Sequence, residues 1–224
     1  MTGAPWQPRA NEQCAATYAR ISRGTDLRKT SAHEIDDDIG VAGDRYVCLL
    51  RGINVGGKNV IKMMDLRARF EALGHSDVAS YIASGNVVFG AKRASPVKLA
   101  ATIEQALEAA FGYAARVVLL TAEQVAQVID EAPPGFGKQA AKYRYDVAFV
   151  RPPVRAHDVL PQLPAKDGVD TIAAGTHALY LRRLTAKASQ SHLARISGKP
   201  VYQDLTIRNW NTSVALAKLL AARP

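Results

Sequence analysis

The 224-residue chain has little cysteine and no long apolar run. Its two cysteines are Cys14 and Cys48, too few for the disulfide framework of a small secreted domain. No stretch approaches the roughly 20 apolar residues that cross a bilayer, and the N-terminus lacks the apolar core of a secretory signal. These absences predict a protein of the reducing cytoplasm that has no membrane partner.

The patterns of common catalytic and metal sites are missing as well. The five histidines show no metal-ligand spacing. There is no G-x-S-x-G nucleophile elbow, and neither cysteine lies near a plausible base. The aromatic signature of an RNA-recognition domain is also absent. We therefore expect no metal and no cofactor, and the sequence leaves open whether any reaction is catalysed.

The net charge of +9 is unevenly distributed. Residues 1–44 hold five basic and seven acidic side chains, whereas the remaining 180 residues hold 24 basic and 13 acidic ones. This excess favours anionic partners, either a phosphate-bearing small molecule or nucleic acid. A generally basic surface explains the charge equally well, because net charge governs association rather than fold.

Residues 1–44 and the rest of the chain differ in apolar periodicity. Residues 1–44 show none that is sustained, so we predict a poorly ordered N-terminal extension. Residues 45–121 predict a first ferredoxin-like subdomain of order β-α-β-β-α-β. Its expected elements are a strand at 46–50, a helix at 62–73, strands at 78–82 and 87–89 around a turn at 83–86, a helix from Pro96 and a strand at 116–120.

Residues 122–224 predict a second ferredoxin-like subdomain with a C-terminal helix. Thr121 and Gln124 form a capping-box pattern for a linking helix at 122–131. The further expected elements are a strand at 143–151, a helix near 155–163, strands at 169–174 and 177–183, a helix at 187–197, a strand at 204–209 and a helix at 212–222. The predicted fold class is therefore α+β, with two packed ferredoxin-like subdomains.

Strands 46–50 and 116–120 are apolar on both faces. A ferredoxin-like unit covers only one sheet face with its own helices, so the second face needs another cover. We expect the second half of the chain to provide it.

The stretch GINVGGKN, residues 52–59, has the G-x-x-x-x-G-K spacing of a phosphate loop. A phosphate loop needs a hydroxyl at the position of Asn59 to bind Mg²⁺, and here the helix after the loop begins later than in such loops. We therefore argue against a nucleoside triphosphatase. In the predicted topology, the end of the first strand lies beside the turn between the second and third strands. This brings together eight candidate ligand-binding residues: Arg51, Asn54, Gly56, Gly57, Lys58, Ser84, Gly85 and Asn86.

Two interpretations of this group stay open. Free backbone amides at glycines, amide side chains and the cations Arg51 and Lys58 would form a nest for an oxyanion. Alternatively, Asn54 and Asn86 only hold the loop backbone together, as asparagine often does in turns.

A second candidate group lies in TIRNWNT, residues 206–212. Trp210 is either a packing anchor or part of a platform for a base or an anion at the start of a helix. Asn211 or Thr212 is the expected helix cap. The candidate ligand-binding residues of this group are Arg208, Asn209, Trp210 and Asn211.

The stretches LLRGINVGGKNVIKMMDLR, ALGHSDVASYIASGNVVF and TIRNWNT occur in this order and resemble the domain-of-unknown-function 1697 (DUF1697) family over about residues 45–222. The resemblance implies an α+β fold with ferredoxin-like subdomains, and it implies no reaction. Our leading hypothesis is a cytoplasmic protein that binds an anionic ligand. The alternatives are an enzyme acting on a phosphorylated small molecule, in which Arg51 and Lys58 stabilise charge, and a scaffold without a ligand. The oligomeric state stays open.

Overall fold

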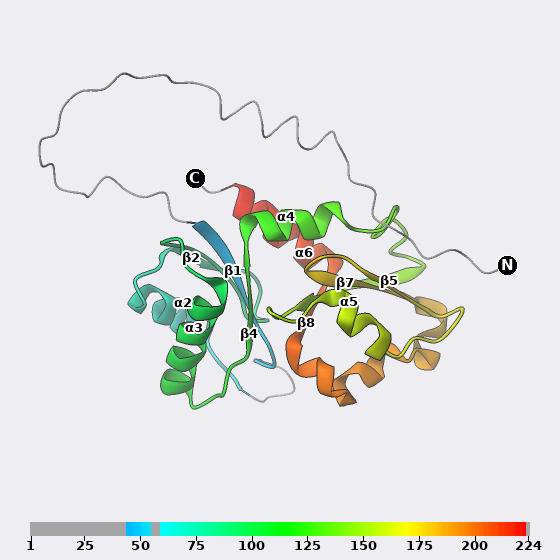
Figure 1. Cartoon of the computed structure of the whole chain (residues 1–224), viewed down its shortest axis with the longest axis horizontal. Coiled ribbons are helices and arrows are strands. Elements are labelled where there is room, and N and C mark those ends of the chain that lie inside the picture. The colour runs from blue at the N-terminus through cyan, green and yellow to red at the C-terminus, as the bar shows by residue number, and fades with distance from the viewer. Residues whose placement is uncertain (1–43, 55–58, 223–224) are drawn as a thin grey trace, which may run out of the picture. The chain divides into compact units, whose positions relative to one another are not determined.

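The computed structural model describes residues 44–54 and 59–222 (Figure 1). The fold is α+β, as predicted, with two four-stranded antiparallel sheets. The first sheet has the order β2-β3-β1-β4, which is that of a ferredoxin-like unit. Its elements are β1 (Asp44–Leu50), α2 (Met63–Ala72), β2 (Ser76–Ser80), β3 (Asn86–Ala91), α3 (Pro96–Phe111) and β4 (Val117–Thr121).

Strand β1 is buried on both faces because its side chains alternate between two hydrophobic clusters. Tyr46 and Cys48 pack in a cluster with α2 and α3, which cover one face of the sheet. Val47 and Leu49 belong to a second cluster, which includes Phe149 of the second sheet. The second half of the chain therefore covers the other face, as predicted.

Strand β2 lies two residues earlier than predicted. It ends at Ser80, and Ile82 in the turn that follows has a left-handed φ of 49°. The backbone N–H of Tyr81 donates to Asn86 O at 2.9 Å and closes the turn to β3.

The linking helix α4 (Ala122–Asp130) begins with the predicted capping box. The Thr121 hydroxyl accepts from Gln124 N at 3.2 Å, and Gln124 Oε1 accepts from Thr121 N at 3.0 Å. These two bonds satisfy backbone N–H groups that have no partner inside the helix.

The second sheet has the order β6-β7-β5-β8, again that of a ferredoxin-like unit. Its strands are β5 (Tyr143–Val150), β6 (Asp170–Ala174), β7 (Ala178–Leu184) and β8 (Leu205–Asn209), and its first helix is α5 (Ala156–Val159), continued by the 3₁₀ turn η1 (Leu160–Gln162). The final helix α6 (Trp210–Ala221) lies beside α4 (Figure 1).

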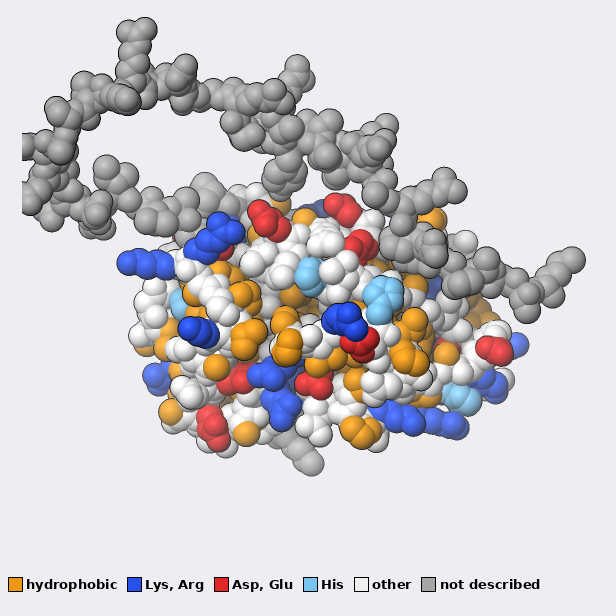
Figure 2. Space-filling view, viewed as in Figure 1, with side chains coloured by type: hydrophobic (Ala, Val, Ile, Leu, Met, Phe, Trp, Pro, Cys, Tyr) orange, Lys and Arg blue, Asp and Glu red, His pale blue; other side chains and the backbone are white. Residues whose placement is uncertain are grey.

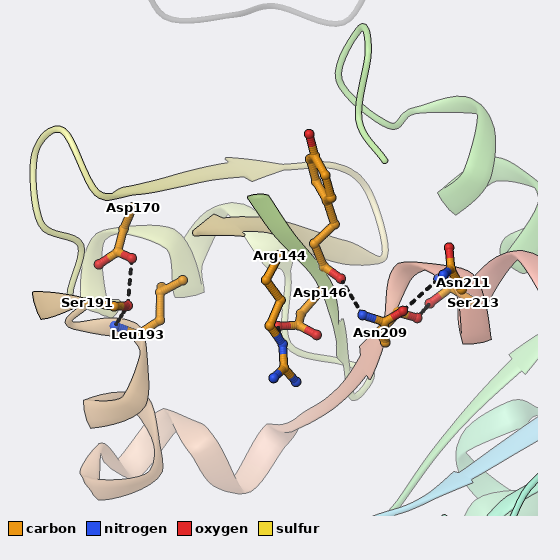
Figure 3. Close-up of polar contacts among 9 residues, drawn as sticks. Arg144, Asp146, Asp170, Ser191, Leu193, Asn209, Asn211 and Ser213 are labelled. Atoms are coloured by element: carbon orange, nitrogen blue, oxygen red, sulfur yellow. Dashed lines mark hydrogen bonds and ion pairs between the residues drawn. The ribbon is translucent and has the colours of Figure 1, made fainter. Parts of the chain in front are cut away.

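The helix predicted at 187–197 is wrong. The chain forms two 3₁₀ segments there, η2 (Thr185–Gln190) and η3 (Leu193–Gly198), and a third, η4 (Pro200–Asp204), follows them. The Asp170 carboxylate accepts from the Ser191 hydroxyl at 2.6 Å (Figure 3). It also accepts from His192 N at 2.8 Å. Ser191 is thereby held in an extended conformation, which separates η2 from η3.

The predicted caps of the last helix, Asn211 and Thr212, are also wrong. The helix begins two residues earlier, and Asn209 is its N-cap: its Oδ1 accepts from Asn211 N at 3.0 Å (Figure 3). An asparagine in this position satisfies one N–H of the first turn.

Candidate functional site

The end of β1 lies beside the β2–β3 turn, as the topology predicts. Leu50 N donates to Gly85 O at 2.8 Å. Asn54 Nδ2 donates to Ala83 O at 2.9 Å and to Ile61 O at 3.0 Å, and its Oδ1 accepts from Ile61 N at 2.8 Å. Asn54 therefore holds three chain segments together with both ends of its amide.

Asn86 and Arg208 connect the two sheets. Asn86 is fully buried, and its Nδ2 donates to Tyr81 O at 3.0 Å and to Ser84 Oγ at 2.9 Å. Its Oδ1 accepts from Arg208 Nε at 2.5 Å. Arg208 Nη2 also donates to Leu50 O at 2.6 Å and to Ser84 O at 2.9 Å. One side chain of β8 thus binds the end of the first sheet.

The Arg208 guanidinium is a buried cation among neutral acceptors. Burial lowers the pKa of Arg208 from 12.5 to about 10, so the group stays protonated at neutral pH. All its hydrogen bonds to described residues end on carbonyl oxygens or on the Asn86 amide.

The other predicted site residues lie apart from this group or outside the described residues. Trp210 is half-buried, and its ring packs edge-on against Phe136 with centroids 5.1 Å apart. Asn209 Nδ2 donates to Tyr145 O at 3.1 Å, next to the exposed Asn211 (Figure 3). Three predicted residues lie outside the described residues: Gly56, Gly57 and Lys58.

A cavity of about 430 Å³ opens at the end of β1. Three of its lining residues lie at the end of β1 or in the 52–59 stretch, three in the connection between α3 and β4, and one in η4. They are Arg51, Gly52, Asn59, Tyr113, Ala114, Arg116 and Gln203.

Our sequence reasoning missed Tyr113, Arg116 and Gln203. The position of Arg116 could have been inferred from the pairing of β1 with β4. Leu50 lies opposite Val117, so the residues just beyond each, Arg51 and Arg116, meet at the same end of the sheet. The backbone N–H of Arg51 donates to Arg116 O at 3.3 Å. No comparable signal marks Gln203, since it lies in η4, which we did not predict.

The two arginines of the cavity are held in different ways. The Arg51 guanidinium lies over the Tyr202 ring, 4.3 Å from its centroid, and it makes no hydrogen bond to the described residues. Arg116 Nη1 lies 3.9 Å from Asp204 Oδ1, at the limit of an ion pair, and its side chain is half exposed. Within the described chain, both cations thus keep donors available for an anion.

Tyr113 fixes the backbone beside these cations. Its hydroxyl donates to the carbonyl of Arg51. Burial raises the pKa of the Tyr113 hydroxyl, although nearby Arg51 acts in the opposite direction, so the group stays a donor at neutral pH.

On the face of the molecule in Figure 2, basic and acidic side chains are mixed and do not form one basic patch. Figure 2 shows Lys and Arg side chains in several separate groups, with Asp and Glu among them. Within residues 44–54 and 59–222, no group of three or more His, Cys, Asp or Glu could hold a metal ion. Over the same residues, no helix combines the length and the apolar character needed to cross a membrane.

Comparisons with known proteins agree with this fold. The model of a family described as "Protein of unknown function (DUF1697)" matches residues 44–180, more than half of the chain. The structure of the conserved bacterial protein SP0830 from Streptococcus pneumoniae superposes with a TM-score of 0.71 at 27% sequence identity. The match covers 80% of this chain and 99% of that one. No curated protein matches the sequence.

Proposed function

The chain belongs to the DUF1697 family of proteins of unknown function, and from its arginine-lined cavity we propose that it binds a phosphate-bearing small molecule. One observation carries the proposal: Arg51 and Arg116 line the same cavity, and none of the described residues that line it is acidic. Guanidinium groups bind phosphate through paired N–H donors, which is stronger than a neutral hydrogen bond.

The dimensions of the cavity favour a small ligand over a nucleic-acid duplex. Its volume of about 430 Å³ lies within the roughly 300–1,000 Å³ of typical small-molecule sites. A duplex needs an extended basic surface for its phosphates, and the face in Figure 2 carries acidic groups between the basic ones.

The predicted residues take two roles in this proposal. Asn54, Asn86 and Arg208 bond to protein atoms, so they hold the backbone near the site rather than contact the ligand. Gly56, Gly57 and Lys58 stay predicted ligand contacts on the loop between Asn54 and Asn59.

The cavity favours binding over catalysis. Among its described residues, the one group that could transfer a proton is the Tyr113 hydroxyl. Its pKa is raised by burial, and its proton is donated to the Arg51 carbonyl. General acid–base catalysis requires a group with a pKa near the working pH. The proposal keeps the protein in the reducing cytoplasm, which its two cysteines suggest.

Thermal unfolding with added phosphate compounds tests the proposal. Inorganic phosphate, pyrophosphate and mononucleotides are added separately at low ionic strength. A ligand that binds only the folded state at 100 times its Kd stabilises the fold by about 2.7 kcal/mol. At least one of these probes should raise Tm, and Arg51→Gln and Arg116→Gln should each weaken its binding by about 10- to 150-fold, since a hydrogen bond to a charged group contributes roughly 1.5–3 kcal/mol.

Arg93→Gln is the matched control, because it removes one charge from a side chain that is 85% exposed and distant in sequence from the cavity residues. Its affinity should equal that of the wild type. The proposal is wrong if no probe raises Tm, or if the Arg51 and Arg116 variants bind as tightly as the control.

A further inference from the structure

A second cavity, of about 200 Å³, lies where β8 separates from β5. Strand β8 pairs with β5 from Asp146 to Val150, and after Asn209 the chain turns into α6. The edge of β5 at residues 143–145 is therefore free of a strand partner on this side. The cavity is lined there by Tyr143, Arg144, Tyr145, Thr185, Trp210 and Asn211.

Aromatic rings form a continuous row at this cavity. Trp210 packs edge-on against Phe136, and Phe136 packs edge-on against Tyr145 at 4.8 Å between centroids. Tyr145 in turn lies 6.2 Å from Tyr143. Three members of the row, Tyr143, Tyr145 and Trp210, line the cavity. The row thus presents apolar ring surface to any molecule that enters.

Cations surround the Tyr143 end of the row. Lys142 Nζ lies 5.2 Å and the Arg182 guanidinium carbon 4.8 Å from the centroid of the Tyr143 ring. Arg144 and Arg183, which pair across β5 and β7, lie on the opposite face of the sheet, because successive side chains of a strand alternate between the two faces. The cations beside the rings are therefore Lys142 and Arg182.

Within the described chain, neither Lys142 nor Arg182 forms an ion pair with a carboxylate. The ion pair of this part of β5, Arg144 Nε with Asp146 Oδ2 at 2.9 Å, lies on the other face of the sheet (Figure 3). Both cations beside the rings therefore keep their charge available for an anion.

Three polar groups of the cavity are available to a ligand. The hydroxyls of Tyr145 and Thr185 and the carboxamide of Asn211 make no hydrogen bond to another of the described residues. A carboxamide and hydroxyls of this kind can pair with the polar edge of a base, while the rings contact its faces.

We propose that this cavity binds single-stranded nucleic acid, with one unpaired base inside it and the flanking phosphates on Lys142 and Arg182. A row of aromatic rings beside cations is the arrangement by which single strands are bound, through stacking of bases and neutralisation of phosphates. At about 30 Å³ per molecule of liquid water, 200 Å³ holds six or seven waters, which is room for one base. A duplex is excluded, because its base faces are covered by the neighbouring pairs. The inference is independent of the arginine-lined cavity.

Tryptophan fluorescence tests the proposal in the full-length protein. The chain has two tryptophans, Trp6 and Trp210, so a Trp6→Phe variant reports on Trp210 alone. An oligouridine and an oligothymidine of roughly ten nucleotides, within the range of known single-strand sites, should change the Trp210 emission. Affinity should fall with rising salt, with a log–log slope of about −0.7 for each phosphate neutralised.

Two variants on the Trp6→Phe background locate the binding. Ala140 is exposed at the cavity rim, so Ala140→Phe should fill the cavity without disturbing the core and weaken binding at least tenfold. Arg182→Gln should reduce the magnitude of the salt slope by about 0.7, since one phosphate contact is lost. Lys98→Gln, an exposed charge on α3, is the control and should leave slope and affinity unchanged.

Three outcomes would overturn the proposal. One is an oligonucleotide that leaves Trp210 emission unchanged. The second is an affinity for a mononucleotide equal to that for the oligonucleotide, which would identify a small-molecule site. The third is an equal loss in Lys98→Gln and Arg182→Gln, which would show binding through net charge alone.

Discussion

Replacing Arg208 by methionine should destabilise the fold, although it removes a buried charge. Methionine keeps a long unbranched side chain but donates no hydrogen bond. The three shortest bonds of Arg208 to the first half of the chain are lost, to Leu50 O, Ser84 O and Asn86 Oδ1, together with a longer one of 3.4 Å to Gly85 O. At roughly 1.5–3 kcal/mol for a bond to a charged group, the loss is about 5–9 kcal/mol.

The removed charge offsets part of this loss. The lowering of the Arg208 pKa from 12.5 to about 10 reflects its burial, and at 1.36 kcal/mol per pKa unit it corresponds to about 3 kcal/mol. The expected net destabilisation of Arg208→Met is therefore about 2–6 kcal/mol. Arg208→Lys should not restore stability, because a lysine ammonium cannot reproduce the planar set of donors that reaches all three acceptors.

Urea unfolding at neutral pH measures this effect, with Arg182→Met as the matched control. Arg182 makes one side-chain hydrogen bond to a described residue, Thr171, in an exposed position, so its loss should cost less than about 1 kcal/mol. A double-mutant cycle of Arg208→Met with Asn86→Ala should give a coupling of about 0.5–3 kcal/mol, because the two side chains share a bond. The reasoning fails if Arg208→Met is as stable as the control, or if the coupling is zero.

Three further predictions concern stability. Thr121→Ala should lower the free energy of unfolding by about 1 kcal/mol in urea, because the capping box of α4 is lost, whereas Thr121→Ser should retain it. Gly137→Ala should cost more than Gly135→Ala: both residues have positive φ, but only the new Cβ at 137 would lie 2.3 Å from Trp210 Nε1. The pKa of His75 is lowered by burial from 6.5, so the folded state resists protonation and stability falls as pH drops below about 6.5. His75→Phe should show a smaller loss of Tm than the wild type between pH 7.5 and pH 5, and an equal loss would contradict this.

Local patterns determine most of this fold, which is why the sequence predicts it. Strands β1 and β4 are apolar on both faces, and this alone indicates that a second layer covers the first sheet. The start of α4 is predicted because Thr121 and Gln124 lie within one turn of each other. The failure at 187–197 has a non-local cause: Asp170 fixes Ser191 and His192 from another strand, and no short window of sequence contains that contact.

The site is predicted in part for the same reason. The topology brings Asn54 to the β2–β3 turn, and this contact is observed. The partner of Asn86 on the second sheet, Arg208, lies 122 positions away. The sequence shows that Asn86 and Arg208 are polar residues near turns, but it does not indicate that their side chains form a hydrogen bond. The position of Gln203 could not be predicted either, because it depends on η4, which the sequence pattern did not indicate.

Segment η4 and strand β8 connect the site to the junction of the two sheets. Tyr202, which holds the Arg51 guanidinium, lies in η4, and η4 runs directly into β8, which carries Arg208. Arg208 bonds to Leu50, the residue before Arg51. Two contacts from the second half of the chain therefore fix Arg51. The Tyr202 ring holds its guanidinium, and Arg208 holds the Leu50 carbonyl that precedes the backbone N–H of Arg51. Arg208→Met should thus weaken phosphate binding under conditions in which the variant is still folded, although Arg208 does not line the arginine-lined cavity. Unchanged phosphate affinity in the folded variant would show that Tyr202 alone positions the cation.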